Sequence, residues 1–162
     1  MVCPQCKAKT ATGEQCKLTT CKQYPYCWIH LKKIDGLQVK KSEIAGEGLF
    51  YVGKKDFQPN KIIAYYSAKE VTRKPINGEY VLEVGKNKYL DGKDKSNYVG
   101  RYVNSTRGTG KQPNVRFASN GVITKRNGRD TVPIITKKKI KPNTELLMNY
   151  GKDYKLPKKK KK

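Results

Sequence analysis

All five cysteines and the only histidine of this 162-residue chain lie within its first 30 residues. Neither residue type follows His30, so the rest of the chain cannot rely on them for cross-links or metal sites. The odd number of thiols and the lack of an apolar N-terminal signal core argue against a secreted disulfide scaffold. So short a segment buries too little apolar surface to fold alone, and a zinc ion would supply the missing stability. We therefore predict a zinc-binding module over residues 1–33.

Six residues compete for the four positions of a zinc site. The pair Cys27-x2-His30 has the tight spacing that lets two ligands meet one ion, and Trp28 between them can cover it. The stretch CKAKTATGEQC followed by CKQYPYCWIH resembles a short Cys/His module found beside other domains in large DNA viruses. The ligands that this resemblance implies are Cys6, Cys16, Cys27 and His30. Alternatives left open are Cys3 and Cys21, with Cys3-x2-Cys6 as a rival pair.

The chain is strongly basic, with 36 Lys and Arg against 13 Asp and Glu and a formal net charge of +23. Only six of the basic residues are Arg, and the C-terminal run of five lysines explains little of the excess. Because Lys acts as a point charge, this composition favours non-specific attraction to DNA, RNA or an acidic protein face. A bias towards Lys that serves only solubility is the alternative. No apolar run reaches the roughly 18–20 residues that span a bilayer, so no membrane partner is expected.

From residue 34 onward, short apolar runs alternate with turn signals. Few stretches keep a 3.6-residue period over ten or more residues, so we predict a mainly β body of many short strands. One or two short helices or turns are expected near Ser96–Tyr102, and a disordered Lys-rich tail over 157–162. The predicted strands are 37–39, 48–52, 61–66, 80–84, 98–99 and 132–135. The predicted turns are Asn77-Gly78, Asp91-Gly92, Asn120-Gly121 and Asn127-Gly128.

Three motifs follow one another along this body. They are IAGEGLF at 44–50, GRYVNS at 100–105 continued by PNVRF at 113–117, and IKPNTELLMNYG at 140–151. Each alone is weak, but in this order and at these spacings they resemble the SET domain of protein-lysine methyltransferases. The resemblance covers about residues 36–154 and places a SET domain over 34–156. It implies short strands in small sheets, with a knot-like crossing of the second and third motifs.

The resemblance implies a site for S-adenosylmethionine. A glycine turn lets the backbone approach a ligand closely, and in this family the turn that cradles the cofactor corresponds to Ala45, Gly46 and Glu47. Asn104 and Ser105 correspond to the start of the family's Asn-His-Ser, whose members hold the cofactor. Ser105 stands where His is usual: the change is tolerated if backbone groups carry the role, and it lowers cofactor affinity if a ring contact matters. The loop 106–112 is longer than the family's commonest form.

The resemblance also assigns catalytic residues. Methyl transfer from a sulfonium to an amine is a one-step displacement that needs alignment and desolvation of a neutral lysine. Tyr150 matches the family's terminal tyrosine, which contacts both the cofactor and the reacting groups, and Tyr66 matches a second channel tyrosine. Tyr65 takes that place if the register slips by one. Phe117 and Met148 are expected in the lysine channel. Met148 cannot supply the hydroxyl that holds a crowding water, so more than one methyl transfer is expected.

The predicted activity is S-adenosylmethionine-dependent methylation of a lysine on a histone or another basic chromatin protein. A non-catalytic SET-like scaffold that binds nucleic acid or chromatin through the zinc module and basic surface is the alternative. Because enzyme and histone tails are both basic, nucleosomal DNA is expected to bridge them. A homodimer is compatible with the sequence.

The sequence also bears on the location of the protein in the cell and on how the lysine channel is closed. We expect a nuclear location, which for a virus-encoded protein is the nucleus of the host cell, or otherwise a cytoplasmic location. Secretion is not expected. The family's C-terminal cysteine cluster is missing. Residues 151–156, a partner or the N-terminal module must therefore close the lysine channel, and Tyr154 is a candidate to cover the cofactor.

Overall fold

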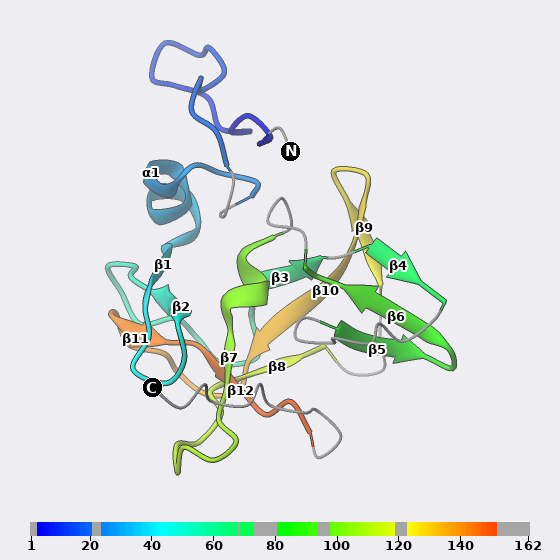
Figure 1. The fold of residues 1–162 in the computed structure, drawn as a ribbon. Helices are drawn as coiled ribbons and strands as arrows, with labels where there is room; N and C mark the ends of the chain where they lie inside the picture. The colour runs from blue at the N-terminus through cyan, green and yellow to red at the C-terminus, as the bar shows by residue number, and fades with distance from the viewer. Residues whose placement is uncertain are drawn as a thin grey trace, which may run out of the picture.

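The computed structural model describes residues 3–20, 24–67, 69–72, 81–93, 98–118 and 123–151. Short strands dominate these residues and form three small sheets (Figure 1), which confirms the mainly β prediction. None of the helices in the described ranges is both long and apolar enough to cross a bilayer.

The N-terminal module lies at one end of the molecule (Figure 1). Its two arms pair through the isolated bridges Gln5↔Thr19 and Lys9↔Gln15. A short helix α1, Trp28–His30, continues as a π-helical turn η1, Leu31–Asp35, and leads into the first strand. Gly36 ends the turn in the left-handed region with φ 64°, a conformation that a side chain disfavours.

The first sheet has the order β1-β2-β11 and carries the first motif. Its strands are β1 Leu37–Lys41, β2 Glu47–Tyr51 and β11 Thr144–Glu145. The antiparallel register Lys41↔Glu47 leaves residues 42–46 as the turn between β1 and β2. The third motif therefore begins beside the first, although about 100 residues separate them.

The second sheet has the order β3-β10-β8-β12-β7, with β9 also paired to β10. β12 runs parallel to both neighbours, with Leu147 opposite Asn104 and Met148 opposite Ser105 and Val115. The second and third motifs thus lie side by side, as the family resemblance implies. The strands are β3 Ile62–Ser67, β7 Asn104–Ser105, β8 Val115–Phe117, β9 Thr124–Arg126, β10 Arg129–Thr136 and β12 Leu147–Met148.

The third sheet, β4-β6-β5, is followed by the 3-10 helix η2, Val99–Tyr102. Its strands are β4 Lys69–Val71, β5 Val81–Gly85 and β6 Lys88–Asp91. The predicted strand at 98–99 is wrong: Tyr98 forms only an isolated bridge to Tyr24, and Val99 begins η2. All four residues of η2 are buried, so the apolar run reflects burial on every side rather than a strand.

The predicted turns can be compared where the structure describes them. Asn127 and Gly128 both have positive φ, 50° and 73°, as a two-residue hairpin turn between β9 and β10 requires. Gly92 lies in the turn that follows β6. Asn77-Gly78 and Asn120-Gly121 lie outside the described residues.

The module and the body have separate cores that meet at aromatic side chains. Cys6, Ala8, Cys16 and Cys27 form the small core of the module, and Tyr26 packs against both cores. Next to it, the Tyr24 ring meets the Tyr98 ring edge-on at 5.0 Å, and the Arg129 guanidinium lies 4.6 Å from the Tyr24 ring centre. The module is therefore packed on the body just before η2. The proposed boundary between residues 33 and 34 stays a prediction.

Candidate functional site

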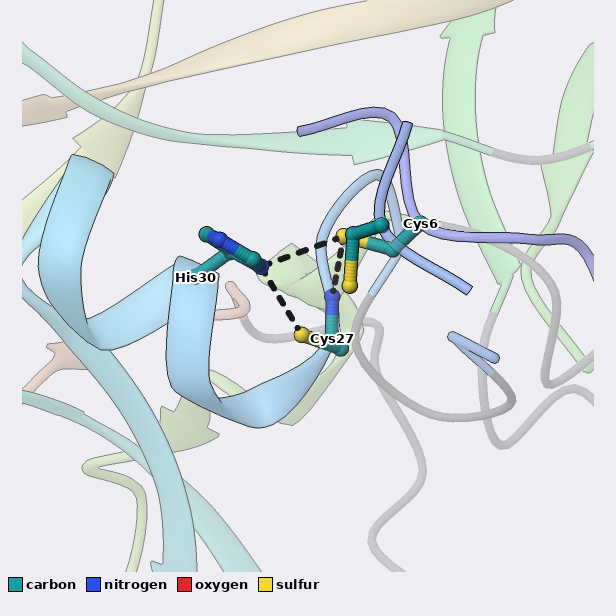
Figure 2. Close-up of side chains that lie close together, drawn as sticks. Cys6, Cys27 and His30 are labelled. Carbon is teal, nitrogen blue, oxygen red and sulfur yellow. Dashed lines mark hydrogen bonds between the residues drawn. The ribbon is translucent and has the colours of Figure 1, made fainter. Parts of the chain in front are cut away.

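The Cys/His cluster joins the two halves of the module. Cys6 and Cys16 come from its two arms, whereas Cys27 directly precedes α1 and His30 is the last residue of α1, and the four ligand atoms lie within 4.8 Å of one another. Figure 2 shows Cys6, Cys27 and His30 pointing toward one another. His30 Nδ1 is 3.2 Å from Cys27 Sγ and 3.7 Å from Cys6 Sγ.

These residues fit a zinc ion by chemistry and by spacing. Three thiols and one imidazole form a common structural zinc set, and tetrahedral Zn–S and Zn–N bonds of about 2.3 and 2.0 Å place neighbouring ligand atoms about 3.5–3.8 Å apart. The separations from His30 Nδ1 fall close to that range. All three thiols are buried. The cluster can therefore hold a metal, and the four predicted ligands are the residues that converge.

The thiols have different proton affinities. Burial raises the pKa of Cys6, but hydrogen bonds from the backbone N–H groups of Cys27 and Ala8 outweigh it, so the net pKa lies below the usual value. The Cys27 N–H lies 3.2 Å from Cys6 Sγ. Burial raises the pKa of Cys27, and the neighbouring Cys6 adds to the rise. The N–H donors thus favour a thiolate at Cys6, the form that binds metals.

Of the two reserve cysteines, the structure describes only Cys3, which is not part of the converging group. Cys3 is disulfide-bonded, although the odd number of thiols argued against a disulfide scaffold. A thiol that is not needed as a ligand is free to form such a bond. Cys21 lies outside the described residues.

The glycine turn predicted to cradle the cofactor is fixed by hydrogen bonds to a buried side chain, and its outer surface is exposed to solvent. Ala45, Gly46 and Glu47 are all exposed, and Gly46 adopts φ 49°. The hydroxyl of Ser42, which is 8% exposed, accepts hydrogen bonds from the N–H groups of Ile44 at 3.0 Å and Ala45 at 3.4 Å. The turn therefore presents backbone to solvent while a buried hydroxyl fixes its shape.

Asn104 lies directly against this turn. Its Nδ2 donates to the Glu47 carbonyl at 3.1 Å, the Ala45 carbonyl at 3.3 Å and Glu145 Oε1 at 2.9 Å. Ser105 is buried, and its hydroxyl accepts the Arg107 N–H at 3.2 Å, so it closes a local turn. The structure thus brings together the two segments predicted to hold the cofactor.

The predicted channel residues line a single pocket. Tyr66, Phe117, Met148 and Tyr150 all border it, although they come from β3, β8, β12 and the segment after β12. The rings of Tyr66 and Phe117 meet edge-on, with centroids 5.8 Å apart and planes at 79°. Tyr66 is 6% exposed and Met148 is 2% exposed. An aromatic and apolar wall of this kind disfavours a charged ammonium and favours the neutral amine.

The two tyrosines next to each other in β3 have different surroundings. The Tyr65 ring lies under the Arg126 guanidinium at 4.1 Å, and its hydroxyl accepts Arg126 Nη1 at 2.7 Å. Tyr66 instead borders the pocket, so the geometry favours it over the alternative register. The Tyr150 hydroxyl donates to the Val103 carbonyl, which ties this ring to the backbone immediately before Asn104.

Arg101 is a pocket residue to which the sequence analysis gave no role. It borders the pocket beside Tyr66 and Tyr150, is 7% exposed, and donates from Nη1 to the Lys93 carbonyl at 3.0 Å. A permanent positive charge in the pocket wall also disfavours a second cation, which lowers the pKa of any ammonium that enters. Arg101 lies within the second motif, but nothing in the sequence around it indicates that its side chain is buried.

Some predicted features cannot be placed. Ala68, which follows the Tyr66 segment, and Tyr154 lie outside the described residues, as does the segment from 152 onward. The longer loop at 106–112 reaches the residue that directly precedes the first motif: Lys111 Nζ lies 3.7 Å from Glu43 Oε2.

Comparisons with known proteins agree with this arrangement. The family model described as the SET domain matches residues 6–151. The fold is similar to a crystal structure of a Plasmodium falciparum protein described as a "putative histone methyltransferase", with 22% sequence identity and a TM-score of 0.53. That likeness covers 74% of this chain and 96% of the other. No curated protein matches the sequence. The chain therefore belongs to the SET domain family.

Proposed function

We propose that this protein is a lysine N-methyltransferase that uses S-adenosylmethionine and modifies a histone or another basic protein. One observation carries the proposal: in a SET-family chain, Tyr66, Phe117, Met148 and Tyr150 border one pocket. The exposed glycine turn is hydrogen-bonded to Asn104, which directly follows the pocket residue Val103. Family membership supports lysine methylation as the general activity, and the pocket supports a lysine side chain as the group that enters.

The residues of this chain serve the reaction by positioning and desolvation. S-adenosylmethionine, when bound, supplies the methyl group as an activated electrophile. The ring pair Tyr66–Phe117 and the side chain of Met148 exclude water from the lysine, which favours its neutral, nucleophilic form. The Tyr150 hydroxyl, whose proton is directed to the Val103 carbonyl, keeps oxygen lone pairs for weak C–H···O contacts with a methyl group. Alignment of the lysine amine with the methyl group supplies much of the rate acceleration.

The decisive experiment is a methyl-transfer assay read by mass spectrometry. Core histones and nucleosomes are incubated with S-adenosylmethionine and either the wild type or Tyr150→Phe. We expect methylated lysine with the wild type and a loss of about 100-fold or more in the variant, because a positioned polar group at a reaction centre contributes on this scale. If neither protein transfers methyl and calorimetry detects no cofactor binding, the non-catalytic scaffold becomes the better reading.

We further propose that nucleic acid is a partner and that chromatin is the place of action. The module turns Tyr24 and Tyr26 toward the body, whereas Trp28 is 59% exposed. Exposed lysines at 7, 9, 17, 32 and 33 surround the module. An exposed aromatic ring among cations suits base stacking and phosphate attraction.

Trp28 makes this partner measurable because it is the only tryptophan of the chain. Titration with a single-stranded oligonucleotide is expected to change its emission, with an affinity that falls steeply with salt. Trp28→Ala, which lacks this fluorophore and is followed by the anisotropy of a labelled oligonucleotide, should weaken binding by about tenfold, within the range for loss of one base–aromatic stack. An unchanged emission at low salt would argue against this face. Equal activity on free tail peptides and on nucleosomes would make a DNA bridge unnecessary.

A further inference from the structure

We infer that Glu145 is a positioning residue for the cofactor site, holding the glycine turn and Asn104 in one arrangement. The inference rests on the proposed function for its ligand, but its geometric part stands on contacts within the chain. Glu145 lies inside the third motif, as the last residue of the short strand β11.

One carboxylate oxygen joins three segments that are far apart in sequence. Glu145 Oε1 accepts the Ser42 hydroxyl at 2.7 Å and Asn104 Nδ2 at 2.9 Å. The same Ser42 hydroxyl accepts the N–H groups of Ile44 and Ala45. An unbroken chain of hydrogen bonds thus runs from the turn through Ser42 and Glu145 to Asn104.

The strand register explains why the carboxylate sits there. Glu145 pairs with Phe50 across β2 and β11, which directs the side chain along the start of β2. A Cβ atom at Gly48 would lie 3.0 Å from Glu145 Cδ and 3.1 Å from Ser42 Cβ, and it would collide with Oε1. Gly48 therefore leaves the space that the carboxylate occupies, a requirement separate from the flexibility of the turn itself.

The hydrogen bonds donated by Nδ2 also determine which side-chain atom of Asn104 can bind a ligand. Nδ2 faces two backbone carbonyls and a carboxylate, and all three are acceptors, which fixes the orientation of the amide. Both amide hydrogens are therefore directed into the protein. Asn104 meets its ligand through Oδ1, an acceptor, so the ligand must present an N–H or O–H donor there. An amino group meets that requirement, and a carboxylate does not.

Three variants and one control test the inference in the full chain. Glu145→Ala removes both bonds, Glu145→Asp shortens the side chain by one methylene, and Glu145→Gln keeps an acceptor oxygen without the charge. Glu83→Ala removes an exposed carboxylate from β5 and serves as the control. Two readouts are taken for each: hydrogen–deuterium exchange of residues 42–48 without ligand, and the dissociation constant for S-adenosylhomocysteine by calorimetry.

We expect Glu145→Ala to speed exchange at 42–48 and to weaken S-adenosylhomocysteine binding, each by about tenfold, as the loss of one or two hydrogen bonds implies. Glu145→Gln should stay within about threefold of the wild type, because its amide oxygen keeps both acceptor contacts. If Glu145→Ala unfolds, Glu145→Asp is expected to show faster exchange and weaker binding in the same direction, with a smaller magnitude.

Two results would overturn the inference. The first is that residues 42–48 exchange at the same rate in Glu145→Ala as in Glu83→Ala. The second is that Glu145→Gln speeds exchange and weakens S-adenosylhomocysteine binding as much as Glu145→Ala does. Failure of the wild type to bind S-adenosylhomocysteine would refute the proposed function. The exchange measurement, made without ligand, would still decide whether Glu145 holds the turn.

Discussion

Gly100, in η2, tests whether the pocket wall depends on close backbone packing. A Cβ atom at this position would lie 2.6 Å from the Tyr65 carbonyl carbon and 2.7 Å from Ile134 Cδ1, and it would collide with the Tyr65 carbonyl oxygen. Ordinary contacts begin at 3.4 Å. Gly100→Ala must therefore separate η2 from β3 by at least about 0.8 Å, and this shift also displaces the pocket residue Tyr66, which follows Tyr65.

The size of the effect follows from this displacement. Overpacking of a core contact lowers the free energy of unfolding by about 1–3 kcal/mol. In a chain of this length that corresponds to a fall in melting temperature of roughly 2–12 °C. A misplacement of about 1 Å near reacting groups reduces rates by up to about 100-fold. We therefore expect kcat/KM for methyl transfer to fall by about 10- to 100-fold in Gly100→Ala.

Gly85→Ala provides the matched control, because an added Cβ there would meet only Lys88 Cβ, at 4.0 Å, and φ is not positive. Thermal unfolding is followed by circular dichroism, and methyl transfer by mass spectrometry well below both melting temperatures. If Gly100→Ala melts and reacts like Gly85→Ala, η2 does not brace the pocket in the way described.

Three further predictions concern the metal, a buried acid and the product. Cys16→Ser should abolish binding of one zinc per chain by elemental analysis and lower the melting temperature, whereas Lys17→Ala should keep the metal; equal zinc in both would exclude Cys16 as a ligand. Burial raises the pKa of Asp35, against the opposing charge of Arg126. The protonated form therefore favours folding, and stability is lost as pH rises through the folded pKa. Asp35→Asn should stabilise the protein more at pH 7 than at pH 4 in denaturant melts, and an equal gain at both would contradict this. Met148→Tyr should restrict the product to monomethyl-lysine by mass spectrometry, while Met148→Phe, which has no hydroxyl, should not; trimethyl product from both would count against the role of the hydroxyl.

The sequence predicted those features that are encoded locally. The Asn127-Gly128 turn needs two left-handed residues, and this dipeptide supplies them. The grouping of all Cys and His residues in one short segment predicted a metal module, but spacing alone left six candidates for four positions, and the four ligands came from the resemblance to a Cys/His module. The three motifs indicated the family through their order and spacing, and the structure pairs the third motif with the first and with the second.

The features that were missed depend on contacts between distant segments. Nothing near Glu145 in the sequence indicates that its carboxylate reaches Ser42, 103 positions away. Tyr98 was assigned to a strand because local apolar patterning cannot distinguish a buried bridge from a strand, and its partner Tyr24 lies in another module. Burial of Arg101 likewise follows from its surroundings in space, which a linear pattern does not contain.

The place of β12 in its sheet has a consequence for how the protein is made. β12 lies between β8 and β7, so these two strands are joined only through a segment that leaves the ribosome after both of them. Until residues 147–148 arrive, the nascent chain has a sheet with a missing middle strand and a pocket without Met148 and Tyr150. Pairing over such sequence separation is slow and leaves strand edges open to other chains. Early termination shortly before residue 147 would therefore yield an aggregation-prone chain and not merely an inactive enzyme.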